Sequence, residues 1–308
     1  MMKNLRTHCE AILITGPTAS GKSALALELA DRHGGVVVNA DSMQVYDTLR
    51  VLTARPSETE MAGIPHRLYG HVPATTAYST GDWLRDVETL LATLREEGRL
   101  PVFVGGTGLY FKALTGGLSD MPTIPDELRE RLRQRLIEEG PAPLHRELAV
   151  RDPVSAGRLQ QSDGQRIVRA LEVVEATGQS IVTYQERRGP ILVDPDRAEK
   201  IVVLPDRALL HRRIDRRFEI MLETGAIDEV RALQALSPSP DMPVMKAIGV
   251  AEISALLRGE MTPAAVIERG SALTRQYAKR QMTWFRNQMD ESWRRHDPLA
   301  AVGTGEPS

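Results

Sequence analysis

Hydrophobic residues along the chain follow two patterns, one typical of buried strands and one typical of amphipathic helices. Short runs of apolar, mostly β-branched residues predict strands that are buried in a core. These runs are residues 11–15 (AILIT), 36–38 (VVV), 100–104 (LPVFV) and 201–204 (IVVL). The first run leads through a glycine-rich turn into the strong helix former ALALELA at 24–30. This order predicts an α/β core with a parallel sheet flanked by helices.

The middle of the chain has a helical pattern. Within residues 125–139, Leu128, Leu132 and Leu136 recur at every fourth position, which indicates the apolar face of a helix. Residues 164–177 (GQRIVRALEVVEAT) have a second apolar stripe of this kind. We therefore expect a smaller, all-helical insertion domain at residues 118–196. The α/β core is then expected to comprise residues 1–117 and 197–308.

Residues 206–222 predict another helix, which has an apolar row and a basic row. The apolar row is Leu210, Ile214 and Phe218, at every fourth position. Arg213 and Arg217 form the basic row, and their spacing alone favours a solvent-exposed face. The functional alternative aims one of these arginines at a bound phosphate, where a fixed cation offsets leaving-group charge.

Composition narrows the class of protein. The 308 residues are 42% hydrophobic and 26% charged, which is ordinary for a soluble globular protein. The net charge of −2 provides no global basic field, so a nucleic-acid partner would have to be held by local patches. No window approaches roughly 18 uncharged apolar residues, and we therefore predict no membrane span.

The amino-terminal segment and the cysteine content bear on the location of the protein. Residues 1–10 contain no apolar segment of the kind that directs secretion. The single cysteine, Cys9, excludes an intramolecular disulfide and a cysteine-cluster zinc site. Both features fit a reducing cytoplasm, which is the predicted location.

The strongest local signal is GPTASGKS at residues 16–23, which lies between the first predicted strand and its helix. This is the order that a phosphate-binding P-loop requires. The glycines let backbone N–H groups turn toward an anion, and the helix N-terminus adds partial positive charge. Lys22 supplies a cation, and the hydroxyl of Ser23 can reach Mg²⁺. The pattern predicts a polyphosphate site without specifying a nucleotide, and a glycine-rich turn with no ligand is the plainer alternative.

Two other strand ends carry candidate residues. Asp41 follows the second strand within NADSMQVY (39–46). A carboxylate at the carboxyl end of a parallel strand can hold Mg²⁺ or accept a proton, and a helix cap or turn is the alternative. The strand at 100–104 ends in Gly105-Gly106-Thr107 without a carboxylate, and no N-K-x-D sequence occurs in the chain. Both absences argue against an ATPase or GTPase.

Residues 269–289 are basic and contain aromatic residues. The basic residues are Arg269, Arg275, Lys279, Arg280 and Arg286, and no acidic residue lies among them. Tyr277, Trp284 and Phe285 are interleaved with them. Basic side chains bind phosphates while aromatic rings stack on unpaired bases, so this stretch is a candidate RNA surface. An ordinary surface helix with its aromatic residues facing the core is the alternative.

Seven segments, taken in order, resemble the tRNA dimethylallyltransferases (tRNA isopentenyltransferases) of bacterial type. They are GPTASGKS (16–23), NADSMQVY (39–46), GGTGLYF (105–111), DGQRIVRALEV (163–173), PDRALLHRRIDRRFEIM (205–221), IG (248–249) and RQYAKRQMTWFR (275–286). The resemblance implies a P-loop NTPase-like fold. It also implies transfer of a dimethylallyl group from dimethylallyl diphosphate to N6 of the adenosine on the 3′ side of the anticodon. The tRNAs would be those that read codons beginning with U, and diphosphate would be released.

The resemblance also implies roles for individual residues. By similarity Asp41 is the general base, and Thr107 and Arg217 support the leaving group. The diphosphate would be bound by Gly16, Pro17, Thr18, Ala19, Ser20, Gly21, Lys22 and Ser23, with Mg²⁺ on Ser23. The anticodon stem-loop of tRNA would be contacted by Asp41, Ser42, Met43, Gln44, Thr107, Arg129, Gln165, Arg166, Ile167, Val168, Arg169, Lys279, Arg280, Gln281, Trp284 and Arg286. Many relatives have Tyr where this chain has Val250, which weakens a polar role for that position.

Two other functions compete with this interpretation. A P-loop kinase acting on a small molecule or nucleotide shares the fold, Lys22 and Mg²⁺, but it needs ATP. A non-catalytic RNA-binding module is the third, although such a protein has little use for Lys22 and Asp41 in one crevice. We see no heptad repeat or obvious pairing surface, and the chain is therefore predicted to be a monomer.

Overall fold

The computed structural model describes residues 9–187 and 189–298, which form two compact units. The larger unit comprises the described residues up to Thr115 and from Leu192 onward, and the smaller unit is Gly116–Ile191. Residues 1–8 are not described, so most of the segment used to predict the absence of a secretory signal lies outside the structure. The boundary at Leu192 falls before the predicted 196 because Leu192 and Val193 both donate backbone hydrogen bonds to Leu114 O of the larger unit.

The larger unit contains a parallel six-stranded sheet of order β3-β2-β4-β1-β5-β6. The strands are β1 (Ala11–Thr15), β2 (Val36–Asn39), β3 (His66–Arg67), β4 (Pro101–Gly105), β5 (Ala198–Val203) and β6 (Arg294–His296). The predicted parallel α/β sheet is confirmed. Strand β6 has the sequence RRH, and it offers no apolar run from which a strand could be predicted.

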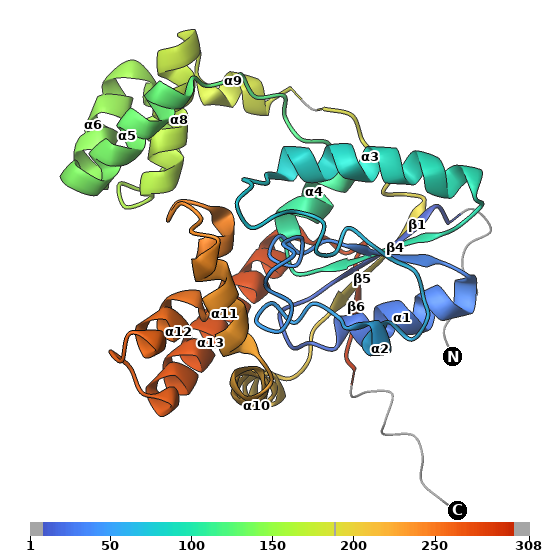
Figure 1. Ribbon diagram of the computed structural model, residues 1–308. Coiled ribbons are helices and arrows are strands. Elements are labelled where there is room, and N and C mark those ends of the chain that lie inside the picture. Colours follow the sequence, from blue (N-terminus) through green and yellow to red (C-terminus); the bar gives the residue numbers. More distant parts are fainter. Residues whose placement is uncertain (1–8, 188, 299–308) are drawn as a thin grey trace, which may run out of the picture. The chain divides into compact units, whose positions relative to one another are not determined.

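Helices cover both faces of this sheet (Figure 1). The helices of the larger unit are α1 (Lys22–His33), α2 (Glu58–Met61), α3 (Thr80–Glu96), α4 (Gly108–Gly116), α10 (Arg207–Glu223), α11 (Ala226–Ala235), α12 (Val250–Leu257) and α13 (Pro263–Gln288), with a 3₁₀ turn η1 (Pro243–Lys246). Alternate residues of the strands face α1 on one side and α3 with α4 on the other. Burial on both faces explains why the strands are continuous apolar runs.

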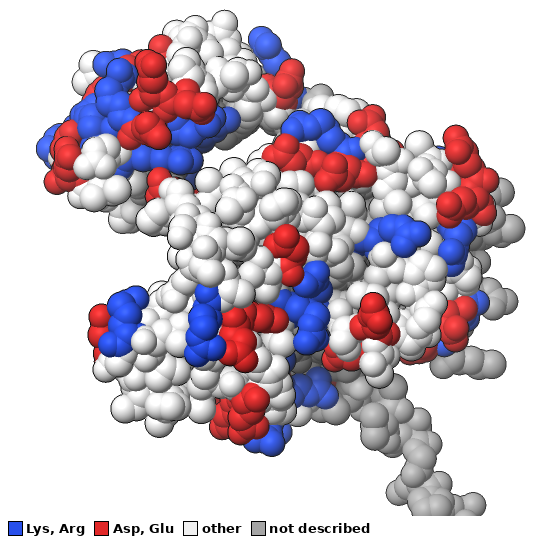
Figure 2. All heavy atoms as spheres, in the orientation of Figure 1, with Lys and Arg blue, Asp and Glu red and all other residues white. Residues whose placement is uncertain are grey.

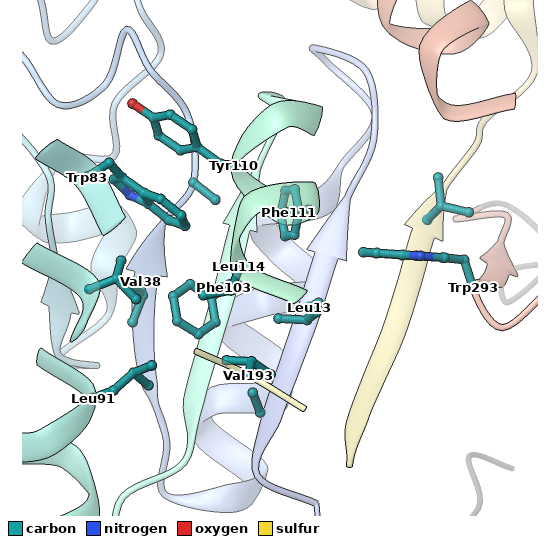
Figure 3. Close-up of a cluster of buried hydrophobic side chains, with 14 of the residues drawn as sticks. Leu13, Val38, Trp83, Leu91, Phe103, Tyr110, Phe111, Leu114, Val193 and Trp293 are labelled. Atoms are coloured by element: carbon teal, nitrogen blue, oxygen red, sulfur yellow. The ribbon is translucent and has the colours of Figure 1, made fainter. Parts of the chain in front are cut away.

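The face covered by α3 and α4 carries an aromatic cluster (Figure 3). The rings of Trp83 and Tyr110 stack with centroids 4.2 Å apart, and Phe103 of β4 meets Trp83 edge-on. The indole N–H of Trp83 donates to Asn39 O at 2.9 Å. This contact ties α3 to the end of β2, just before Asp41.

A second core lies among α10, α11, α12 and α13 and the segment that follows β2. Val45, Leu49 and Leu52 of that segment pack with Phe218 of α10. Strand β2 lies in the sheet, and the segment that follows it packs on these helices. The residues that join the strand to this segment are therefore fixed by both cores. Val250 is 1% exposed in this core, so its side chain is not available for RNA.

The smaller unit contains only helices among its described residues. They are α5 (Asp126–Glu139), α6 (Pro141–Arg151), α7 (Pro153–Ala156), α8 (Gly164–Thr177) and α9 (Ile181–Gln185). Leu128 and Leu132 of α5 pack with Ile167 and Leu171 of α8 in a core of its own. The predicted apolar stripes therefore face each other inside this unit.

Candidate active site

The glycine-rich loop between β1 and α1 brings its backbone close to neighbouring groups. Gly21 caps α1 with φ of 91°, a left-handed conformation that favours glycine. A Cβ added to Gly16 would lie 2.6 Å from Val203 O, so only glycine fits there. The hydroxyl of Ser20 is buried and has no hydrogen-bond partner among the described residues. The loop therefore has the conformation and the open polar groups of an anion cradle.

Two cationic side chains, Lys22 and Arg217, lie beside this loop, with the carboxylate of Asp41 nearby. Lys22 Nζ donates to Pro17 O at 3.3 Å. Burial lowers the pKa of Lys22 to about 8, against the opposing effect of Asp41, and the nearby Arg217 lowers it further. Burial also lowers the pKa of Arg217, and Asp41 again opposes the shift. An anion bound between these side chains would favour their charged forms and gain charge-assisted hydrogen bonds.

Arg217 is the residue of the basic row on α10 that reaches the loop. Its guanidinium donates a hydrogen bond to the hydroxyl of Thr18. The solvent-exposed interpretation of this row is therefore wrong for Arg217, because α10 packs against α13 and turns this face inward. Arg213 also approaches the loop, since its Nη1 lies 3.8 Å from the position of a Cβ on Gly21.

The side chain of Gln281 connects the phosphate loop to the end of β4. Its Oε1 accepts from Thr18 N at 2.9 Å, and its Nε2 donates to Gly106 O at 2.8 Å. The residue is only 5% exposed. The prediction that Gln281 contacts tRNA is therefore corrected: its amide is used inside the protein, where it fixes the spacing of two loops.

Asp41 is held by the segment that follows β2. Asn39 is fully buried; its Oδ1 accepts from Asp41 N at 2.9 Å, and its Nδ2 donates to Asp41 O and Leu68 O, both at 3.0 Å. Asp41 Oδ1 accepts from Met43 N at 3.0 Å. The other oxygen, Oδ2, lies 3.3 Å from the position of a Cβ on Gly106. Glycine at 106 therefore keeps space beside this carboxylate oxygen.

The side chain of Thr107 links the residues that follow β4 to those that follow β2. Its hydroxyl accepts from Ser42 N at 3.0 Å and donates to Ser42 Oγ at 3.2 Å. A Cβ added to Gly105 would lie 1.9 Å from Ala40 O, which explains the glycine there. The predicted support of a leaving group by Thr107 would need its hydroxyl to exchange this partner, and it stays a prediction.

A cavity of about 290 Å³ opens beside the phosphate loop. It is lined by Thr18, Asp41, Ser42, Met43, Leu52, Thr53, Ile214, Arg217, Phe218, Met221, Lys246, Ala247, Ile248, Thr274, Tyr277 and Arg280. Thr18, Asp41 and Arg217 supply polar lining where the loops meet, while Phe218 and Met221 continue α10 as an apolar wall. No local motif marks the apolar lining, because its residues come from four separate parts of the chain.

Three tyrosines near Asp41 keep their phenol protons. Burial is the main cause of the raised pKa values of Tyr69, Tyr110 and Tyr277, and the negative charge of Asp41 adds to it. Tyr277 lies in the cavity lining, and the guanidinium of Arg280 lies 5.7 Å from its ring centroid. The carboxylate thus lies near neutral phenols on several sides.

The basic stretch of α13 divides between surface and core. Lys279, Arg280 and Arg286 are exposed, whereas Phe285 is 2% exposed. Trp284 is half-buried, and Gly108 leaves room for its ring, since a Cβ there would lie 2.2 Å from it. A groove of about 540 Å³ is lined by Gln276, Lys279, Arg280, Thr283, Trp284, Asn287 and Gln288. The stretch predicted to bind RNA therefore lines a basic and partly aromatic groove, with Phe285 excluded from it, and its binding of RNA stays a prediction.

In the helical unit, the predicted tRNA contacts separate in the same way. Gln165 and Arg166 are exposed. Ile167 and Val168 are 0% and 4% exposed and belong to the core, so their predicted side-chain contacts with tRNA are wrong.

Several charged residues of this unit form ion pairs with one another. Arg169 pairs with Glu172 at 3.1 Å, and Arg129 pairs with Asp126 at 2.8 Å. Basic and acidic side chains are interleaved over this unit (Figure 2). The positive charge of this unit is therefore confined to local patches, as expected for a chain with a net charge of −2.

Two further classes of site can be assessed in the described part of the chain. Residues 9–187 and 189–298 contain no group of three or more His, Cys, Asp or Glu side chains arranged to hold a metal ion. No helix among them is long and apolar enough to cross a membrane.

Sequence comparison relates nearly the whole chain to one family. The family described as IPP transferase matches residues 44–288, and the family described as Isopentenyl transferase matches residues 9–71. The tRNA dimethylallyltransferase of Rhizobium meliloti (strain 1021) is 68% identical over 303 residues, covering 98% of this chain and 100% of the relative. That of Agrobacterium fabrum (strain C58) is 68% identical over 298 residues, covering 97% and 100%.

Solved structures give the same relationship. The tRNA isopentenylpyrophosphate transferase of Bacillus halodurans matches with a TM-score of 0.65 and 33% identity, covering 94% of this chain and 90% of that one. A eukaryotic dimethylallyltransferase acting on tRNA matches with a TM-score of 0.80 and 26% identity, covering 96% and 76%. The likeness therefore extends over both units of the chain.

Proposed function

The chain belongs to the IPP transferase family, and on that premise we propose that it is a tRNA dimethylallyltransferase. The reaction transfers a dimethylallyl group from dimethylallyl diphosphate to N6 of the adenosine 3′ of the anticodon, in tRNAs that read codons beginning with U. Diphosphate is released. We propose that the protein acts as a monomer in the cytoplasm, where its tRNA substrate is found.

One observation carries this proposal: a single cavity joins the phosphate loop to an apolar wall. Thr18, Arg217 and Asp41 line it together with Phe218 and Met221. A prenyl diphosphate has the same division, with a polyanionic head and a hydrocarbon tail. The head would bind between Lys22 and Arg217, and the tail would bury apolar surface at about 25 cal/mol per Å².

The same residues account for the chemistry. The bond between the allylic carbon and the diphosphate oxygen breaks, and a bond from that carbon to N6 forms. Asp41 takes the N6 proton, which localises the nitrogen lone pair for attack. Lys22 and Arg217 stabilise the negative charge that develops on the leaving oxygen, and each such contact contributes on the order of 10²–10³ in rate.

The chemistry of the loop also fits Mg²⁺. Ser23 is exposed at the first turn of α1, and its hydroxyl is a hard oxygen donor of the kind Mg²⁺ prefers. Because the described residues offer no carboxylate cluster, most ligands would be diphosphate oxygens and water. When bound there, Mg²⁺ would neutralise charge on the diphosphate; Lys22 and Arg217 orient the same group.

For tRNA, we propose that the groove of α13 and the exposed polar side chains of the helical unit provide the contacts. Lys279, Arg280 and Arg286 would bind phosphates, and Trp284 offers an aromatic ring to an unpaired base. Gln165, Arg166, Arg169 and Arg129 would bind RNA from the helical unit. The target base must leave the stacked anticodon loop before its N6 reaches Asp41.

The kinase alternative is less well supported. A P-loop kinase uses an acidic metal ligand at a strand end beside the loop. Strand β4 ends instead in Gly105 and Gly106, and the neighbouring Thr107 is bonded to Ser42.

The proposed function is tested by incubating the protein with undermodified tRNA, Mg²⁺ and radiolabelled dimethylallyl diphosphate. Digestion of the RNA is expected to place the label on the adenosine next to the anticodon. A parallel reaction with labelled ATP tests the kinase alternative. Label absent from that adenosine, or ATP turnover with a small acceptor, would reject the proposal.

The role of Asp41 is tested separately with Asp41→Ala. We expect the single-turnover rate at saturating substrates to collapse while tRNA affinity stays near that of the wild type. Loss of tRNA binding without loss of the saturated rate would instead assign Asp41 a structural role.

A further inference from the structure

The ring of Phe218 is seated between two glycines. A Cβ added to Gly270 would lie 2.0 Å from Phe218 Cζ, and a Cβ added to Gly249 would lie 3.3 Å from the same atom. Either distance is too short for an unmoved side chain. Gly270 lies in the middle of α13, where glycine destabilises a helix by about 0.5–1 kcal/mol relative to alanine. The close packing of Phe218 against this position explains why a glycine occurs there.

Leu52 packs in the same core as the ring, beside Gly249. Gly249 has φ of 101°, and a Cβ there would lie 2.7 Å from Leu52 Cδ1. The backbone of Leu52 is itself held, because Glu229 of α11 accepts from the N–H groups of Arg50, Val51 and Leu52 at 3.1, 2.6 and 3.0 Å. Phe218 is only 3% exposed. Its ring is thus closely packed within this core.

This fixed ring forms part of the cavity wall. Phe218 directly follows Arg217, whose guanidinium bonds to the phosphate loop, and Met221 lies one helical turn beyond Arg217. One turn of helix spans about 5.4 Å. The apolar wall on α10 therefore begins at Phe218, the residue next to the arginine that hydrogen-bonds to the phosphate loop.

We propose that Phe218, seated on Gly249 and Gly270 and backed by Leu52, is the stop that limits the prenyl donor to five carbons. The inference rests on the proposed function and adds to it the residue that selects the donor. A ten-carbon allylic diphosphate has the same reacting carbon and leaving group. Its second isoprene unit would meet this closely packed ring.

The test compares dimethylallyl diphosphate with geranyl diphosphate as donors to tRNA. In the wild type, the ten-carbon donor is expected to be used poorly. Phe218→Ala and the milder Phe218→Leu are expected to raise the ten-carbon to five-carbon ratio of kcat/KM by about tenfold or more, within the range that one apolar group contributes to discrimination. Phe285→Leu is the matched control, because Phe285 is equally buried but does not line the cavity; its ratio should not change.

A second variant tests the seat of the ring. Gly270→Ala forces the Phe218 ring to move and is expected to raise the KM for dimethylallyl diphosphate by about tenfold. Adding Phe218→Leu should restore it, which a general loss of stability would not. Unchanged ratios in both Phe218 variants, with five-carbon transfer still measurable, would overturn the inference alone. A wild type that transfers no dimethylallyl group would overturn the proposed function instead.

Discussion

The guanidinium of Arg217 donates a hydrogen bond to the hydroxyl of Thr18, a residue 199 positions earlier in the chain. This contact joins α10 to the phosphate loop, so a residue of a helix that follows β5 completes a site that begins after β1. Both side chains line the same cavity. A cation held in this way is already in place when charge develops on the leaving group.

Replacement of this cation should therefore slow the chemical step. We expect Arg217→Ala to lower the single-turnover rate at saturating donor by about 10²–10³ with little effect on tRNA affinity. Arg216→Ala is the control, because Arg216 is mostly exposed and pairs with Glu219 on the surface. A rate for Arg217→Ala within a few-fold of the Arg216→Ala rate would show that Arg217 has no part in leaving-group departure.

The two hydrogen bonds made by the Gln281 side chain should contribute to the free energy of unfolding and to binding of the donor. Gln281→Leu leaves Thr18 N and Gly106 O without their buried partner, which costs about 1–3 kcal/mol. Denaturant unfolding measures this loss. Gln281→Glu keeps the acceptor but adds negative charge near the diphosphate, so the donor KM should rise more than in Gln281→Leu. Equal KM values in the two variants would contradict the position assigned to this side chain.

The lowered pKa of Lys22 predicts that donor binding depends on pH. Burial lowers its pKa to about 8 in the free protein, and a bound diphosphate must raise it because the anion favours the charged form. Above pH 8 binding thus takes up a proton, and the dissociation constant should rise about tenfold per pH unit. Below that pH the affinity should level off.

Titration calorimetry in buffers of different ionisation enthalpy measures this proton uptake directly. Lys22→Met should bind the donor weakly at every pH, without the rise that begins near 8. A wild-type affinity that stays constant up to pH 10, roughly two units above the shifted pKa, would show that Lys22 does not bind the donor as a cation.

The salt dependence of tRNA binding should reveal the phosphate contacts of α13. Lys279→Ala and Arg286→Ala are each expected to weaken tRNA binding and to reduce the slope of log affinity against log salt by about one. Arg85→Ala is a control on α3, where Arg85 is exposed and paired with Asp82. Slopes unchanged from the wild type in both α13 variants would remove this helix from the RNA surface.

The parts of the fold that the sequence predicts are those with a periodic apolar signal. β1, β2, β4 and β5 and helices α5, α8 and α10 follow from runs or stripes of buried residues. Helix α3 was missed although Trp83, Val87, Leu91 and Leu94 form its buried face. Its capping box, in which Ser79 and Asp82 exchange hydrogen bonds, is the start signal that would have located it.

The candidate site divides in a similar way. Lys22 and Asp41 follow from motifs at strand ends, because parallel strands deliver their carboxyl ends to one edge. Gln281 and Phe218 could not be assigned from sequence, since their roles depend on contacts between segments far apart in the chain. Ile167 and Val168 were misassigned because a resemblance covers a whole segment, while a helix divides that segment between solvent and core.

The central claim is that the glycine-rich loop holds a prenyl diphosphate, with its tail in the adjoining cavity. The most direct measurement is a crystal structure of the protein soaked with both an unreactive thio analogue of dimethylallyl diphosphate and an ATP analogue. The account predicts diphosphate density between Lys22 and Arg217 and hydrocarbon density against Phe218. Adenine nucleotide in the loop, with the prenyl analogue excluded, would contradict it.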